Sequence, residues 1–222
     1  MLKIIQHAIA NGRKTLSEYE SRLVIESAGV LVAAAALAKT RDEAVEAAER
    51  IGYPVVMKGC SAELTHKTEA DMVALNIGSS EEAARIFDKL TDEMKNLDGV
   101  LVEKMVRGSR EFVIGLSRDP QFGPCVMFGL GGIFTEALKD VTFRVAPLTK
   151  EDALEMLDEI KTKKLLGEFR GSPAVDRNAL AKALVGVGDL GIKYDSIAEI
   201  DINPLIICGD KPVAVDALVV LK

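Results

Sequence analysis

Apolar residues recur along this chain at two spacings, and the change from one to the other divides it into helices and strands. Spacings of three and four residues, which predict amphipathic helices, follow capping sequences that begin at Ser17, Thr40 and Ser79. Each of these residues is followed three positions later by a glutamate, as in a capping box. The spacing also predicts helices over residues 150–160, 162–169 and 177–190.

Short apolar runs bounded by glycine, proline or polar clusters predict strands. These runs lie at residues 30–37, 54–57, 72–77, 100–102, 111–116, 123–128, 142–147, 197–202, 205–208 and 213–218. Helices and strands mixed in this order, with several hairpin-like strand pairs, indicate the α+β class rather than a doubly wound sheet.

The same pattern suggests where the chain divides. Residues 1–15 are expected to form a short leader. A boundary is predicted near residue 103, where two helix-rich halves meet through a single strand. The expected subdomains are therefore residues 16–103 and residues 104–222.

Composition narrows the class of protein. Apolar residues make up 48% of the 222 residues, which is typical of a globular chain. The 28 basic and 34 acidic residues give a net charge of −6, which argues against general nucleic-acid binding. No apolar run approaches the roughly 20 residues of a membrane span, and no signal core opens the chain. A cytoplasmic protein with no membrane partner is expected.

The cysteines point to the same compartment. Cys60, Cys125 and Cys208 are odd in number, far apart and outside any C-x-x-C pair. This spacing argues against both a disulfide framework and a zinc site. Reduced thiols are therefore expected.

Three glycines, Gly129, Gly131 and Gly132, follow the predicted strand 123–128 within an apolar run. Glycine tolerates positive φ and close approach of another backbone. The run can be a simple tight turn, or a nest whose N–H groups bind an anion such as a phosphate. The pattern alone leaves both open.

Lys58 closes the otherwise apolar run that begins at Pro54. A lysine at a strand end is usually a solvated terminus. The alternative is a clamp that neutralises charge on a polyphosphate.

Acidic residues near the C-terminus suggest a metal site. Glu199, Asp201 and Asn203 share one face of a predicted strand, because side chains alternate with a period of two. Asp216 falls within the next apolar strand, where an isolated carboxylate is costly unless it is paired or metal-bound. Hard oxygen ligands suit Mg²⁺, and the alternative is a set of solvated carboxylates.

His66 lies in a polar loop. A loop histidine is most often simply exposed, but it can also be a nucleophile that accepts a phosphoryl group. The pattern does not decide between these interpretations.

Taken together and in order, these segments resemble the ATP-grasp subunit (β) of the ADP-forming, or NDP-forming, acetyl-CoA and acyl-CoA synthetases. The resemblance runs from about Leu16 to the C-terminus. The matching stretches are residues 16–20, 52–58, 66–68, 119–123, 128–136, 140–144 and 201–205. Each stretch alone is a weak signal, whereas their combination is specific. Succinyl-CoA synthetase is similar at a greater distance.

The resemblance implies an ATP-grasp fold in which two α+β subdomains hold a Mg-nucleotide between them. It implies the reaction acyl-CoA + ADP + phosphate ⇌ acid + CoA + ATP, with ADP or ATP and Mg²⁺ as cofactors. In that family the reaction passes through an acyl phosphate and a phosphohistidine on a CoA-binding partner subunit.

The resemblance also assigns residues to nucleotide binding. Lys58 corresponds to a lysine that contacts the phosphates, and residues 103–106 correspond to the stretch that holds adenine, largely through backbone groups. The glycines correspond to a loop near the transferred phosphoryl group. The full nucleotide-binding set is Lys58, Glu103, Lys104, Met105, Val106, Glu111, Gly129, Gly131 and Gly132.

Metal and catalytic roles follow from the same comparison of motifs. Asn203 and Asp216 correspond to Mg²⁺ ligands, with Asp201 beside them. Arg144 corresponds to an arginine near the transferred charge, and His66 to a second histidine proposed as a phosphate carrier.

A CoA-binding region has no room in 222 residues beside these segments. The resemblance therefore implies a CoA-binding α subunit as partner, in a hetero-oligomer that is expected to be a heterotetramer. Two alternatives stay open: the ATP-grasp domain of a fused regulator of the protein acetyltransferase type, and a non-catalytic nucleotide-binding module. The presence of every candidate catalytic and metal-binding residue favours the enzyme.

Overall fold

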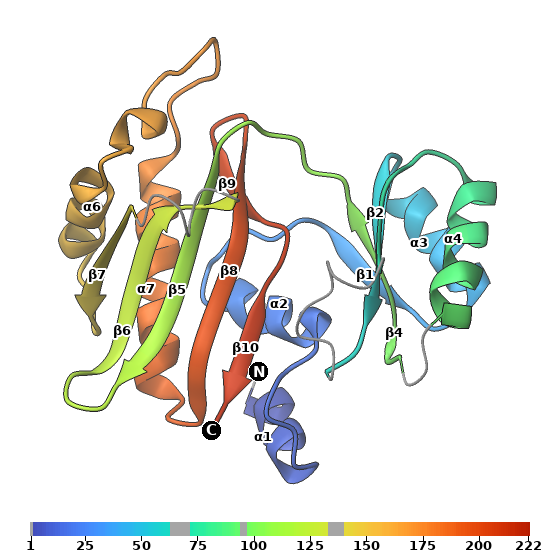
Figure 1. The fold of residues 1–222 in the computed structure, drawn as a ribbon, viewed down its shortest axis with the longest axis horizontal. Helices are drawn as coiled ribbons and strands as arrows, with labels where there is room; N and C mark the ends of the chain where they lie inside the picture. Colours follow the sequence, from blue (N-terminus) through green and yellow to red (C-terminus); the bar gives the residue numbers. More distant parts are fainter. Residues whose placement is uncertain (1, 63–71, 94–96, 133–139) are drawn as a thin grey trace. The chain divides into compact units, whose positions relative to one another are not determined.

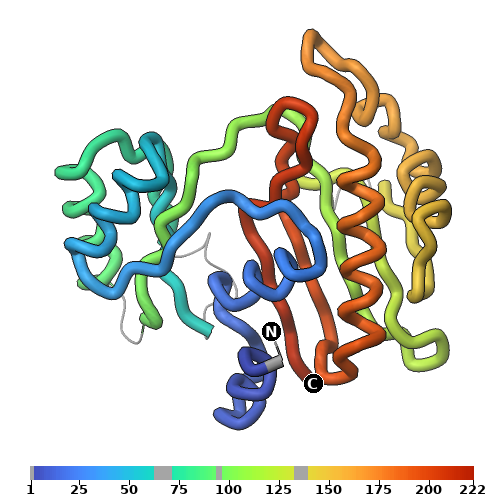
Figure 2. The backbone as a smooth tube through the Cα atoms, turned by 180° about the vertical axis from the view of Figure 1, so that it is seen from behind, coloured from blue at the N-terminus to red at the C-terminus, as the bar shows by residue number. Residues whose placement is uncertain are grey.

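The computed structural model describes residues 2–62, 72–93, 97–132 and 140–222 (Figures 1 and 2). Its contacts separate the chain into two compact units. Unit 1 comprises Met1–Leu16, Ser21–Val32 and Val106–Lys222, and unit 2 comprises Ser17–Glu20 and Ala33–Met105. Each unit is assembled from more than one stretch of the chain.

Unit 2 is a four-stranded antiparallel sheet with two helices (Figure 1). Its elements are β1 (Ala35–Ala38), α3 (Arg41–Ile51), β2 (Val55–Cys60), β3 (Val73–Ile77), α4 (Ser80–Glu93) and β4 (Gly99–Lys104), and the strand order is β1-β4-β2-β3. Alternate strand residues such as Met57 and Val102 pack with Ala48 and Phe87 of the helices in one core. The other face of the strands is therefore directed away from these helices.

The predicted helix starts are confirmed by their caps. The Thr40 hydroxyl accepts a hydrogen bond from the Glu43 N–H at 3.2 Å, and the Ser79 hydroxyl accepts one from the Glu82 N–H at 3.2 Å. At the start of α2 (Glu18–Glu26), the Ser17 hydroxyl accepts from the Glu20 N–H and the Glu20 carboxylate accepts from the Ser17 N–H. These bonds satisfy N–H groups that a helix start leaves without intrahelical partners.

Unit 1 is built on a six-stranded sheet of antiparallel pairs, in the order β10-β8-β5-β6-β7 with β9 paired to β8. The strands are β5 (Glu111–Asp119), β6 (Gly123–Leu130), β7 (Val141–Val145), β8 (Ile197–Cys208), β9 (Lys211–Ala214) and β10 (Leu218–Leu221). The other elements are the helices α1 (Leu2–Ala10), α6 (Lys150–Glu159) and α7 (Arg177–Lys193), and the 3₁₀ turn η3 (Lys163–Leu166). Unit 1 also holds most of α2.

One face of this sheet forms the core of unit 1. Ile114, Phe128 and Ile202, from three neighbouring strands, are buried with Met156 of α6 and Leu184 of α7. Figure 2 shows α7 running across this face. The opposite face, which carries the residues between these core positions, is consequently directed away from α6 and α7.

The first residues of the chain belong to this unit. Residues 1–15 were expected as a leader; helix α1 lies within them, and its Ile5 and Ala8 are buried in the core of unit 1. The Leu16 N–H donates to the Val219 carbonyl at 3.0 Å, and the Leu221 N–H donates to the Lys14 carbonyl at 2.7 Å.

Several predicted strands have different bounds. The strand expected over residues 30–37 begins later, as β1 at Ala35. Val32 makes only an isolated bridge with Ala214. The predicted strands 197–202 and 205–208 are one continuous strand, β8. The predicted helix 162–169 is reduced to the single turn of η3.

The position of Asp216 in a strand is a wrong prediction. The apolar run 213–218 is broken between β9 and β10, and Asp216 lies in the break. There the Ala217 N–H donates to the Asp216 carboxylate at 2.8 Å, and the Val215 N–H donates to the Pro204 carbonyl at 3.3 Å. Hydropathy alone does not show such a break, because the residues around Asp216 are apolar on both sides.

The buried side chain of Arg110 fixes the hairpin between Gly167 and Pro173 in unit 1. Arg110 is 3% exposed, and its guanidinium donates to four backbone carbonyls. The carbonyls belong to Leu165, Gly167, Pro173 and Gly209. Burial of a guanidinium is costly unless its donors are satisfied, so these four bonds account for its position.

None of the helices in the described part of the chain has the length and apolar character that crossing a membrane requires.

Candidate nucleotide and metal site

Lys58 is buried and ion-paired. Strand β2 continues to Cys60, so the prediction that Lys58 closes the strand is wrong. Its ammonium Nζ lies 2.9 Å from Glu18 Oε1 and 3.0 Å from Glu103 Oε2. The side chain of Lys58 is 9% exposed, and those of the two glutamates are 1% exposed. The interpretation of Lys58 as a solvated terminus is therefore excluded.

The strand register explains why these charges meet. Lys58 and Glu103 belong to the face of the unit 2 sheet opposite to Met57 and Val102, which pack on the helices. Glu103 pairs with Val56, two residues from Lys58, so the two side chains are diagonal neighbours. Glu18 approaches from the first turn of α2. One cation thus holds two buried carboxylates.

The stretch after Glu103 is also hydrogen-bonded within unit 2. Lys104 Nζ donates to the Gly52 carbonyl at 2.6 Å, and its N–H donates to the Ala34 carbonyl at 2.8 Å. The Met105 N–H donates to the Pro54 carbonyl at 3.2 Å. Val106 follows as the first residue of the next stretch of unit 1. The assignment of this stretch to adenine stays a prediction.

In unit 1 the glycines of the predicted loop allow close backbone contacts. A Cβ at Gly131 would lie 2.5 Å from the Phe112 carbonyl oxygen, and one at Gly129 would lie 2.5 Å from the Asp140 carbonyl oxygen. Real side chains do not tolerate such distances, so larger residues at these two positions would displace the backbone. Gly129 and Gly131 therefore hold the ends of β5, β6 and β7 close together.

Gly132 has a φ of +70°, a conformation that favours glycine. A Cβ there would collide with the carboxylate of Glu111, which places Glu111 beside the glycines. Two predicted elements lie outside the described residues: His66, within residues 63–71, and the part of the glycine stretch at residues 133–139.

The acidic candidates come together at one place in unit 1. Burial, followed by the negative charges of Glu199 and Asp216, raises the pKa of Asp201 to about 6. Asp216 therefore lies close enough to Asp201 to act on it, although the two belong to different segments. Asn203 is two residues from Asp201 on the same strand face.

These residues fit a hard divalent cation. Among the residues that the structure describes, no three His, Cys, Asp or Glu side chains are grouped to hold a metal. The predicted set instead combines the carboxylates of Asp201 and Asp216 with the amide oxygen of Asn203, and Mg²⁺ commonly takes few protein ligands beside phosphate oxygens and water. The crowding of negative charge around Asp201 is what a cation would relieve.

The strand register separates Arg144 from these acids. One row of paired residues crosses the sheet as Asp201, Gly115, Met127 and Phe143. The adjacent row, displaced by one residue, is Ile200, Leu116, Val126 and Arg144. Ile200, Leu116 and Val126 are buried in the core with α6 and α7. Arg144 and Asp201 therefore start from opposite faces of the sheet.

The contacts of Arg144 agree with this placement. Its guanidinium pairs with both carboxylate oxygens of Glu159 on α6, with Nη1 at 2.9 Å from Oε2. The Thr142 hydroxyl donates to the same Oε2 at 2.7 Å, and Glu155 lies 3.8 Å from the guanidinium. These contacts join β7 to α6. The role of Arg144 near a transferred phosphoryl group stays a prediction.

We expect the Glu159 carboxyl to stay ionised at pH values well below those at which a glutamate side chain is usually protonated. The hydrogen bond from Arg144, followed by that from Thr142, lowers the pKa of Glu159 to about 2. Since the folded-state pKa is below the unfolded value of 4.5, its contribution to stability is present above pH 4.5 and is lost as the pH falls toward 2. An NMR titration of the side-chain carboxyl carbon measures this.

The matched variant for that titration is Arg144→Met, which should return the Glu159 midpoint toward 4.5. A midpoint near 4.5 in the unmodified protein would contradict the ion pair.

Sequence reasoning missed Glu18 as a partner of Lys58. The motifs assign Glu18 to the sequence that caps α2 and to the matching stretch at residues 16–20, and nothing in the spacing of 40 residues between Glu18 and Lys58 predicts their contact. Only the folded arrangement of unit 2 shows that the first turn of this helix supplies a buried carboxylate.

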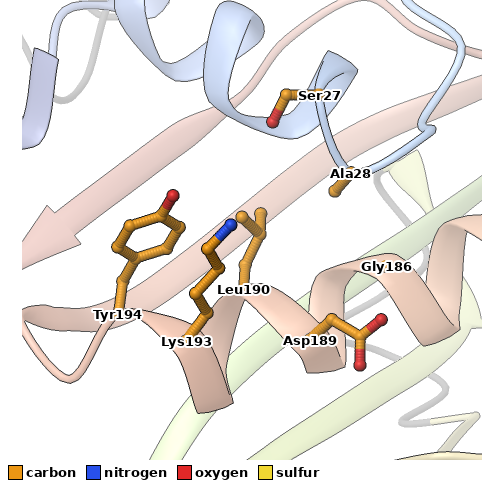
Figure 3. A pocket seen from close by; sticks show the side chains of 7 residues that line it. All are labelled: Ser27, Ala28, Gly186, Asp189, Leu190, Lys193 and Tyr194. Atoms are coloured by element: carbon orange, nitrogen blue, oxygen red, sulfur yellow. The ribbon is translucent and has the colours of Figure 1, made fainter. Parts of the chain in front are cut away.

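A separate cavity of about 220 Å³ lies in unit 1 where the end of α2 approaches α7 (Figure 3). Its lining residues are Ser27, Ala28, Gly186, Asp189, Leu190, Lys193 and Tyr194. A neighbouring cavity of about 450 Å³ shares Ala28, Gly186 and Asp189 with it. None of the residues predicted to bind nucleotide or metal lines either cavity.

Comparison with known proteins identifies the class. The ATP-grasp domain family matches residues 7–221, and the chain belongs to this family. The predicted ATP-grasp fold is therefore confirmed.

The comparisons also indicate the particular relatives. The chain is 45% identical to the acetate–CoA ligase (ADP-forming) I subunit beta of Pyrococcus furiosus, over 99% of this chain and 97% of that protein. It is similar to dinucleotide-forming acetyl-coenzyme A synthetase 1 of Ca. Korarchaeum cryptofilum in complex with coenzyme A and Ca-AMPCP, with a TM-score of 0.94, 41% identity and 99% of each chain covered. The resemblance inferred from the motifs is thus confirmed.

A second structure of the Korarchaeum enzyme holds Mg-AMPPCP, with its phosphohistidine segment pointing towards the nucleotide-binding site. This chain matches it with a TM-score of 0.88 and 41% identity over 99% of each chain.

Proposed function

We propose that this chain is the nucleotide-binding subunit of an ADP-forming acyl-CoA synthetase. Its reaction would be acyl-CoA + ADP + phosphate ⇌ acid + CoA + ATP, with phosphoryl transfer between Mg-ADP or Mg-ATP and a phosphohistidine. The observation that carries the proposal is the likeness to a named β subunit over almost the whole of both chains. The buried Lys58 and the acids around Asp201 supply chemistry that this transfer needs.

The residues of each unit have distinct proposed tasks. Lys58 is the proposed source of positive charge for the polyphosphate, a role that would require its ammonium to leave Glu18 or Glu103 at least in part. Asp201, Asn203 and Asp216 would hold Mg²⁺, which supplies charge neutralisation at phosphate oxygens. Phosphoryl transfer depends on positioning and electrostatics more than on covalent chemistry by the protein.

Further assignments follow the motifs. The proposed nucleotide set extends to residues 103–106, Glu111 and the glycines. His66 is proposed as an intermediate phosphate carrier, which would split one long transfer into two shorter ones. A direct role for Arg144 at the transferred group would require its guanidinium to leave Glu159.

A CoA-binding subunit is the proposed partner, in a hetero-oligomer with two copies of each chain. The likeness to a chain named subunit beta supports a partner of this kind. The cytoplasm is the proposed compartment, where reduced thiols persist.

The test is purification of the chain with its partner, followed by an assay of ATP formation. The tagged chain should recover a subunit with a CoA-binding Rossmann domain, and the complex should make ATP from acyl-CoA, ADP and phosphate. A panel that starts with acetyl-CoA would identify the acid. Recovery of the chain alone at every salt concentration, with nucleotide binding but no turnover, would support a non-catalytic module instead.

A further inference from the structure

Strand β7 lies at an edge of the unit 1 sheet and is anchored in part by side chains. It is the last strand in the order of the unit 1 sheet, where its ladder is formed with β6. An edge strand has one ladder in place of two, so its position depends more on other contacts. One such contact is the group of bonds from Thr142 and Arg144 to Glu159.

Asp140, directly before β7, provides a second anchor. It is 4% exposed, and its carboxylate accepts hydrogen bonds from the Lys161 N–H at 2.7 Å, the Thr162 N–H at 2.8 Å and the Thr162 hydroxyl at 2.5 Å. Burial acts to raise the pKa of Asp140, but the bonds from Thr162 and Lys161 outweigh it, so the pKa lies below its usual range. A buried carboxylate with three donors is fixed in position.

The backbone carbonyl of Asp140 contacts the segment that contains the glycines. Its carbonyl accepts a hydrogen bond from the Leu130 N–H at 3.1 Å, and a Cβ at Gly129 would lie 2.5 Å from the same oxygen. No side chain fits between Gly129 and Asp140, so a shift of one backbone displaces the other. Asp140 therefore links the turn after α6 directly to the glycine segment, residues 129–132.

We propose that Asp140 is a positioning residue for phosphoryl transfer, which fixes the glycine segment by tying it to Lys161 and Thr162. This inference rests on the proposed function, in which the glycine segment lies near the transferred phosphoryl group. Asp140 acts through the backbone and does not touch the nucleotide. Small displacements of groups that position reactants reduce rates strongly, and about 1 Å can cost 100-fold.

Asp140→Asn tests the proposal in the complex with the CoA-binding subunit. An amide removes one acceptor and sets a donor against the donors of Lys161 and Thr162. We expect kcat to fall about 10- to 100-fold, with the KM for ADP changed by less than about threefold, because the glycine segment is proposed to lie near the transferred phosphoryl group, which ADP does not carry. Steady-state kinetics with varied ADP measures both.

Asp152→Asn is the matched control. Asp152 accepts from the Thr149 N–H at 2.8 Å and the Thr149 hydroxyl at 2.7 Å, in the capping box of α6. Its variant should lose thermal stability but keep kcat within about twofold of the unmodified complex. A loss of kcat in Asp140→Asn no larger than in Asp152→Asn would overturn the proposal.

Thr162 gives a second test that is gentler on folding. Thr162→Val removes the hydroxyl and leaves the N–H, so kcat should fall less than in Asp140→Asn, and Thr162→Ser should restore it. Equal rates for valine and serine would count against a positioning role. Failure of the unmodified complex to bind ADP or turn over would instead overturn the proposed function, and this inference with it.

Discussion

Lys58→Met is expected to lower the free energy of unfolding by about 3–5 kcal/mol, because it leaves two buried carboxylates without their shared cation. Glu18 and Glu103 lie 2.9 Å and 3.0 Å from the ammonium, and each is 1% exposed. Methionine preserves most of the side-chain volume, so the loss reports charge rather than a cavity. Urea unfolding followed by circular dichroism measures the change.

The control is Lys89→Met. Lys89 is 49% exposed and lies 3.9 Å from Glu93, so its removal should change stability by less than about 0.5 kcal/mol. Adding Glu18→Gln to Lys58→Met should recover part of the loss, because it removes one of the two negative charges that Lys58 neutralises. Equal stability of Lys58→Met and the unmodified chain would show that the Lys58 ammonium does not stabilise the carboxylates of Glu18 and Glu103.

Asp216→Asn is expected to lower the affinity for ADP in the presence of Mg²⁺ about 10- to 100-fold. Changes in groups that merely support metal ligands have effects of that size, and a ligand itself should have at least as much. The measurement is calorimetric titration of ADP at a series of Mg²⁺ concentrations. Loss of folding is not the expected cause, because Asp216 and Asp201 repel each other.

Asp210→Asn is the control for charge alone, because Asp210 lies near Lys211 in the turn between β8 and β9. It should leave the Mg²⁺ dependence unchanged. Asp216→Asn with the Mg²⁺ response of the unmodified chain would remove Asp216 from the proposed ligand set.

Local chemistry explains which parts of the fold could be predicted from sequence. The caps at Ser17, Thr40 and Ser79 depend on residues three positions apart, so the sequence contains everything needed to predict them. The break in the run around Asp216 depends on two hydrogen bonds. The Val215 N–H donates to the Pro204 carbonyl, and the Ala217 N–H donates to the Asp216 carboxylate. Hydropathy does not record such contacts, and the predicted strand was therefore wrong.

In the candidate site, too, the features that depend on local sequence could be predicted, whereas those that depend on tertiary contacts could not. The shared face of Asp201 and Asn203 follows from a period of two within one strand. The pairing of Lys58 with Glu18 spans 40 residues, and the separation of Arg144 from Asp201 requires the register of four strands. A one-residue change of register would reverse that separation, so only the assembled sheet establishes it.

The anchoring by Arg110 has a consequence for how this protein can vary. All four acceptors of its guanidinium are main-chain carbonyls, which every amino acid provides. Apart from Arg170 and Gly171, whose positive φ restricts the residue type, the hairpin that it fastens can therefore exchange side chains between Gly167 and Pro173 without loosening its base. Such a segment is free to acquire new surface chemistry through evolution, at no cost to the bonds that secure it.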